Sequence, residues 1–162
     1  MKVNFEVEFN NIISDILKNN EFIELKYENH HGISRMRHSL NVAKLTFKMC
    51  KVFNIKSIKD TTRAALLHDF FKSRDIKRLP FLEHPILADE NAKRIFDIND
   101  LQSNIIKSHM FPMCKVLPKH KESFIVSIAD KIVALKECTR YKVPLSLGTA
   151  MLFLFNIVCI HR

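Results

Sequence analysis

The sequence predicts an all-α fold, a compact bundle of about seven helices. Only 2 Gly and 5 Pro in 162 residues leave little material for the many turns of an all-β chain. Apolar residues recur three and four positions apart along nearly the whole chain, and no segment alternates convincingly in the manner of a strand. With 47% hydrophobic residues and no repeat or linker, we expect a single domain over residues 1–162.

The first two helices follow from their apolar stripes. A stripe from Phe5 to Leu17 outlines the first. The stretch NHHGISRMRHSL then reads as a loop that feeds a second helix, with Ser34 as its N-cap and an end near Phe53. The stripe of this second helix places an imidazole among apolar side chains in steps of four and three: His38, Val42, Leu45, Met49 and Val52.

The same spacing predicts four more helices before the chain becomes strongly apolar. In order, they run from Lys59 to about Ser73, from His84-Pro85 to near Phe96, from Asn99 to His109, and from His120 to about Tyr141. Pro80 lies in the loop before the second of these. Pro112 stops the third, and Pro118 closes the loop that follows.

The seventh expected helix is the uncharged run PLSLGTAMLFLFNIVCI at 144–160, with Pro144 at its first turn. Its 17 residues fall short of the about 20 that span a membrane comfortably. We expect a helix buried in the domain or packed in a homodimer, and a membrane anchor is the alternative. The N-terminus has no apolar signal segment, and the four scattered cysteines suit reduced thiols, so we expect a cytoplasmic protein.

The formal charge of +9 favours anionic partners such as nucleotides or phosphorylated small molecules, although a lysine-rich genome explains it equally well. The basic residues are spread along the chain and do not alternate with exposed aromatic residues. We therefore expect no dedicated nucleic-acid site.

Four positions carry metal-competent side chains on helix faces that should be apolar: His38, His68, His109 and Asp130. Each histidine alone is explained more simply as a satisfied core or surface residue. Together with Asp69 they need a common explanation, because burying an unpaired carboxylate or imidazolium is costly. A shared divalent cation supplies one, and nitrogen and oxygen ligands without a thiolate favour Zn, Fe, Mn, Co or Ni over Mg or Ca.

The order His38, His68-Asp69, Asp130 resembles the H…HD…D signature of the HD-domain metal-dependent phosphohydrolases, an all-α, phosphodiesterase-like fold. RMRHSLNVA, AALLHDFFK and IADKI resemble the family's successive motifs. HPILADENA and IIKSHMFP resemble small bacterial HD proteins with two additional histidines. The resemblance covers about residues 30–140. Phe71 departs from it, because many members carry Gly at that place in the motif.

The resemblance implies a metal site with one or two divalent transition metals. The first metal would be held by His38, His68, Asp69 and Asp130, with Asp69 bridging to a second metal held by His84 and His109. For His84 the alternative is a plain helix N-cap. We also expect His84 to stand at a helix N-terminus, where the dipole would keep its ring neutral.

Phosphate chemistry also needs cations around the substrate oxygens. Arg35, which matches the family arginine, is the first choice for a phosphate contact, followed by Lys72 and Lys131. His31 either touches the substrate or lies in a surface loop.

The expected function is hydrolysis of a nucleotide or other small phosphate ester or anhydride by a metal-activated water. Asp69, Arg35 and Lys72 would be the catalytic residues. The alternative is a non-catalytic regulatory module that binds metal or nucleotide.

Overall fold

The computed structural model describes residues 2–30, 32–77 and 80–141. Within these ranges the chain forms seven α-helices: α1 (Lys2–Lys18), α2 (Asn20–Ile23), α3 (Arg35–Val52), α4 (Ile58–Leu67), α5 (Pro80–Phe96), α6 (Asp100–Ser108) and α7 (Lys121–Tyr141). The described chain also contains two short 3₁₀ turns, η1 (Glu24–Tyr27) and η2 (Ser73–Asp75). Two short strands, β1 (Asn29–His30) and β2 (Ile33–Ser34), pair antiparallel. The predicted all-α class is confirmed.

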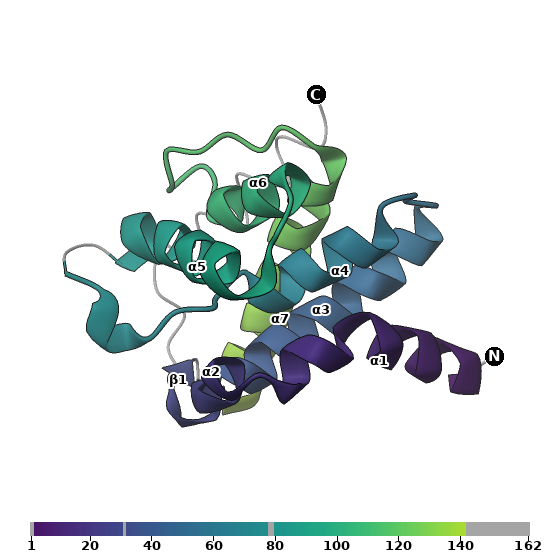
Figure 1. Cartoon of the computed structure of the whole chain (residues 1–162), viewed down its shortest axis with the longest axis horizontal. Coiled ribbons are helices and arrows are strands. Elements are labelled where there is room, and N and C mark those ends of the chain that lie inside the picture. The colour runs from purple at the N-terminus through teal and green to yellow at the C-terminus, as the bar shows by residue number, and fades with distance from the viewer. Residues whose placement is uncertain (1, 31, 78–79, 142–162) are drawn as a thin grey trace.

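Helices α3, α4 and α7 pack against one another in the middle of the molecule (Figure 1). Helix α1 crosses α4 on one side, and the α5–α6 pair lies on the other side, where α6 contacts both α4 and α7. Side chains that point inward from α3, α4, α6 and α7 therefore share one interior.

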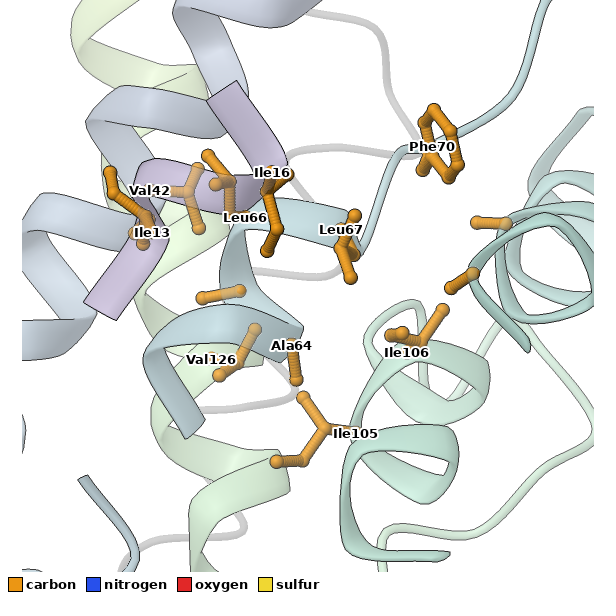
Figure 2. Packing of buried hydrophobic residues seen from close by; sticks show 14 of the residues in the cluster. Ile13, Ile16, Val42, Ala64, Leu66, Leu67, Phe70, Ile105, Ile106 and Val126 are labelled. Carbon is orange, nitrogen blue, oxygen red and sulfur yellow. The ribbon is translucent and has the colours of Figure 1, made fainter. Parts of the chain in front are cut away.

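The main hydrophobic core fills that interior (Figure 2). It joins α1, α3, α4, α6 and α7 through fully buried aliphatic side chains: Ile13, Ile16, Val42, Leu66, Leu67, Ile105, Ile106 and Val126. Burying each such side chain contributes about 1.5–3 kcal/mol relative to leaving it exposed. Three histidines, His38, His68 and His109, are buried as deeply as these apolar residues, each at most 1% exposed.

Several predicted boundaries are confirmed, because local capping chemistry sets them. The Ser34 hydroxyl accepts a hydrogen bond from the Arg37 amide and caps α3. Asn99 caps α6 in a reciprocal capping box with Gln102. The helix predicted from His120 is α7, which begins one residue later.

Other elements differ from expectation. Helix α4 ends at Leu67 rather than near Ser73, and α5 begins at Pro80 rather than at His84. The short helix α2, capped by the Asn19 side chain, was not expected. Neither were β1 and β2, whose two residues each are too few to show alternation.

The apolar run 144–160, and with it the predicted seventh helix and its part in a dimer, lies outside the described residues. Among the helices that the structure describes, none is both long and apolar enough to cross a membrane.

Candidate metal centre

His38 connects α3 to α7 through both of its ring nitrogens. Its Nε2 lies 3.0 Å from Asp130 Oδ1, and its Nδ1 lies 2.7 Å from Glu137 Oε2. Burial lowers the pKa of His38, but the hydrogen bonds with Asp130 and Glu137 outweigh burial and raise this pKa to about 10. Without a metal the ring is therefore an imidazolium that compensates two acids, and a divalent cation would replace its Nε2 proton.

The carboxyl of Asp130 is kept ionised by the same neighbours. Burial raises its pKa, but the contacts with His38 and His68 prevail and hold the pKa well below the usual value. This carboxylate therefore remains available as a cation ligand down to acidic pH.

His68 and Asp69 follow directly after the last residue of α4. Neighbouring residues on a continuing helix diverge by about 100°, so both could not point to the same place. Here the helix stops at Leu67, and a tight turn begins in which the Phe70 amide bonds to the Leu67 carbonyl. His68 Nε2 consequently lies 3.7 Å from Asp69 Oδ2 and 3.6 Å from Asp130 Oδ1.

His84 and His109 approach Asp69 from α5 and from the end of α6. Their Nε2 atoms lie 3.0 Å apart, and they lie 3.5 Å and 3.8 Å from Asp69 Oδ1. Burial lowers the pKa of His109 to about 3, with the nearby His68 and His84 adding to the effect, so this ring stays neutral.

The expected position of His84 at a helix N-terminus was wrong. Because α5 begins at Pro80, His84 lies in the second turn and Pro85 lies inside the helix. The favourable dipole effect is confined to the first turn. His84 is placed instead by packing, with its ring stacked on Phe71 at a centroid distance of 5.1 Å.

The donor atoms fit a metal. The Nδ1 atoms of His68 and His109 each lie within hydrogen-bond distance of a backbone carbonyl, Ala65 at 2.8 Å and Ile106 at 2.7 Å. A neutral imidazole that donates through Nδ1 keeps a lone pair on Nε2. The Nε2 of His68 is buried and has no hydrogen-bond partner within the described ranges.

Two candidate ligand sets meet at His68. One is His38, His68 and Asp130, and the other is His68, Asp69 and His109, with the ligand atoms of each set within 4.8 Å of one another. The structure thus brings together all six residues predicted as ligands, since His84 Nε2 adjoins Asp69 and His109.

Arg35 lies beside this cluster. Its guanidinium carbon is 3.7 Å from the centre of the Phe71 ring, and its Nη1 is 3.8 Å from Asp69 Oδ2. Nη2 donates to the Ser73 hydroxyl, whereas the buried Nε has no hydrogen-bond partner in the described parts of the chain. Phe71, which stands where the resembling motif often has glycine, thus contacts both Arg35 and His84.

The other cations predicted to contact phosphate lie in different surroundings. The buried ammonium of Lys131 bonds to the His109 carbonyl and to both oxygens of Ser127, and these contacts can use all three of its N–H groups. We therefore assign Lys131 no phosphate contact. Lys72 forms an ion pair with Glu24 at the surface. His31 lies outside the described residues.

Glu137 and Asn41 are parts of the site that sequence reasoning missed. The Asn41 amide donates to Glu137 Oε1 at 2.9 Å, while Glu137 Oε2 bonds to His38. A signal was present, because Glu137 follows Asp130 by seven residues and Asn41 follows His38 by three, which places each pair on one helix face.

Comparison with known proteins gives the family. The HD domain family model matches residues 35–135, more than half of the chain. Ribonuclease Y of Mycoplasma capricolum subsp. capricolum (strain California kid) is 32% identical over 121 residues, which are 73% of this chain and 22% of that protein. Ribonuclease Y of Ureaplasma parvum serovar 3 is 32% identical over 117 residues, 72% of this chain and 23% of that protein.

A third relative, Ribonuclease Y of Mesoplasma florum, is 30% identical over 117 residues, 72% of this chain and 22% of that protein. The chain spans less than a quarter of the length of these relatives. No solved structure matched. Because the family model matches more than half of its length, the chain belongs to the HD-domain family.

Proposed function

We propose that this chain is a metal-dependent phosphohydrolase that acts on a nucleotide or another small phosphate ester or anhydride. The observation that carries the proposal is the buried, unsatisfied Nε2 of His68, which lies between the carboxylates of Asp69 and Asp130. Unsatisfied buried nitrogens are rare, and a metal ligand is a direct explanation for one.

Two adjoining positions would hold cations. His38, His68, Asp69 and Asp130 would form the first, and Asp69, His84 and His109 the second. Iron, manganese, cobalt, nickel or zinc would suit these donors. When bound, such a metal pair lowers the pKa of a water toward neutrality and withdraws charge from phosphoryl oxygens.

The remaining residues would orient the reacting groups. Arg35 contacts the Phe71 ring and the Ser73 hydroxyl, and its Nε, which has no partner among the described residues, would be a donor to a phosphate oxygen. Glu137 fixes the ring of His38 through Nδ1, so that Nε2 faces Asp130. Lys72, beside Phe71 at the surface, would be the outer cation of the substrate site if its pair with Glu24 opens.

RNA is a second candidate substrate, because the relatives are named Ribonuclease Y and an RNA phosphodiester needs the same cations and nucleophile. The two candidate substrates give different products. Hydrolysis of a small phosphate ester or anhydride releases a phosphate group, whereas hydrolysis of RNA yields shorter strands.

The experiment is a turnover assay on protein reconstituted separately with each metal. Nucleoside mono-, di- and triphosphates and a single-stranded RNA oligonucleotide would be the substrates, with Asp69→Asn as the inactive control. We expect metal-dependent product formation that this control lacks. A fully loaded protein that binds nucleotides but turns over no substrate would instead be the regulatory module.

A further inference from the structure

A hollow of about 350 Å³ lies between α3 and α7. No predicted metal ligand lines it. Its walls are formed by Ile33, Arg37, Asn41, Lys44, Leu45 and Lys48 with Val133, Lys136, Glu137 and Arg140. We call this hollow the α3–α7 groove.

The groove is strongly basic, since five cationic side chains line it against the single carboxylate of Glu137. Lys44 pairs with Glu6 of α1 at 2.6 Å. For Arg37, Lys48 and Lys136, the described part of the chain provides no ion pair, and all three side chains are exposed. Like charges gathered in a hollow focus a positive potential and attract anions.

The spacing of the cations suits a ligand with more than one charge. Arg37, Lys44 and Lys48 lie on one face of α3, and eleven residues of helix extend about 16 Å at a rise of about 1.5 Å per residue. Lys136 and Arg140, one turn apart on α7, form the opposite wall. A single phosphate group is too small to contact both walls along this length.

The lining also argues against a strand of nucleic acid. Grooves that bind single strands interleave their cations with aromatic side chains on which bases stack. The described lining contains no aromatic residue, and its apolar part consists of Ile33, Leu45 and Val133. Its volume falls in the range of about 300–1,000 Å³ that is typical of small-molecule pockets.

We propose that the α3–α7 groove binds a small anion with several phosphate groups, either a nucleoside triphosphate or an inorganic polyphosphate, at a site separate from the metal centre. This binding does not rest on the proposed hydrolase function. The α3–α7 groove and the candidate metal centre adjoin at Glu137. This residue lines the groove together with Asn41, and its carboxylate is hydrogen-bonded to Nδ1 of His38.

Isothermal titration calorimetry on the metal-free full chain, with sodium tripolyphosphate and separately with ATP as probes, tests the proposal. The groove variant is Lys48→Glu/Lys136→Glu. The matched control is Lys18→Glu/Lys56→Glu, which changes the net charge equally at exposed lysines outside the groove. A third protein, Arg35→Ala, reports on anions bound at the metal centre. Circular dichroism verifies folding, and Lys48→Gln/Lys136→Gln serves as a milder groove variant.

We expect the groove variant to weaken tripolyphosphate binding at least about tenfold, a loss of about 1.4 kcal/mol, while the matched control and Arg35→Ala change it less than about twofold. Tighter binding of ATP than of tripolyphosphate would identify a nucleotide as the ligand, and equal binding an inorganic polyphosphate. Loss of binding in Arg35→Ala but not in the groove variant would overturn the proposal. So would binding of an RNA oligonucleotide through the groove without binding of either probe.

Discussion

The Nε2 atoms of His84 and His109 lie 3.0 Å apart in the interior of the bundle, although 25 residues separate them in the chain. Burial keeps the His109 ring neutral by lowering its pKa to about 3. A hydrogen bond between the two rings needs a proton on one of the two Nε2 atoms, whereas two metal ligands would each present a lone pair. Asp69 Oδ1 lies within 3.8 Å of both nitrogens and supplies the negative charge that a cation requires. The pair is thus placed as two metal ligands would be, and we propose that role for it.

Replacing Asp69 by Asn should abolish metal loading, because the substitution keeps the shape of the side chain but removes the charge that both cations would share. Elemental analysis of gently purified protein measures this directly. Asp75→Asn, at an exposed aspartate in η2, is the matched control and should retain the wild-type metal content. Wild-type metal content in Asp69→Asn would place the metal elsewhere.

Replacing Glu137 by Gln should weaken metal affinity by about 10–100-fold, because the carboxylate that orients the His38 ring is lost. Competition with a chromophoric chelator provides the affinity. Glu122→Gln makes the same change at another buried glutamate of α7, which bonds to the Ser57 hydroxyl and not to a ligand. Equal affinities in the two variants would deny Glu137 its positioning role.

Replacing Arg35 by Ala should leave the metal content intact and lower turnover by about 10²-fold, since one fixed donor to the developing phosphate charge is removed. Steady-state kinetics together with elemental analysis separate these effects. Lys59→Ala removes an exposed cation from the first turn of α4 and should keep full activity. A drop in metal content in Arg35→Ala would show that the arginine supports the ligands instead.

How far the sequence predicts this site depends on whether a residue acts within its own helix. The steps of four and three around His38 placed its imidazole on the buried face of α3, and that prediction is confirmed. The contact of His84 with His109 depends on how α5 packs on α6, which no spacing encodes. The ammonium of Lys131 likewise bonds to the His109 carbonyl, at the end of another helix. The position of Lys131 next to Asp130 in the sequence therefore did not indicate where the lysine side chain points.

The early end of α4 illustrates a different limit. Residues 64–71 are apolar except for His68 and Asp69, so periodicity alone predicts a longer helix. The chain turns at Leu67 because the two polar side chains meet partners on α3, α5 and α7. Tertiary interactions override local propensity here, at a candidate metal-binding position.

Leu66→Ala should lower the free energy of unfolding by about 2–5 kcal/mol, because Leu66 is fully buried in the core and its loss leaves a cavity. Urea denaturation at constant metal load measures the change. Val52→Ala, at a side chain that is 79% exposed, should change the same quantity by less than about 0.5 kcal/mol. Similar losses in both variants would be inconsistent with the described core.

The ion pair of Asp15 with Arg63 should stabilise the fold in a pH-dependent way. The hydrogen bond from Arg63 lowers the pKa of Asp15 below its ordinary value of 3.8, against the effect of burial. A lowered folded-state pKa gives stability that is present above the ordinary value and is lost as the pH falls through the folded-state value. Because Asp15 is exposed, we expect a gain of only about 0.2–1 kcal/mol.

Urea titrations of wild type and Asp15→Asn between pH 3 and pH 7 would show this gain as a difference in unfolding free energy. The difference should be constant above about pH 5 and shrink below about pH 4. Glu90→Gln, at an exposed residue with no ion pair in the described ranges, should show no such difference. A difference that grows on acidification would have the wrong sign.

The buried bonds of Lys131 have a mechanical consequence. They fasten the carbonyl of His109, at the end of α6, to the helix that carries Asp130 and Glu137. A candidate ligand from each of the two sets is thereby attached to the same helix, α7. A tilt of α7 would displace Asp130 and the end of α6 together, so Lys131 would help to fix the spacing between the two proposed cation positions without coordinating either.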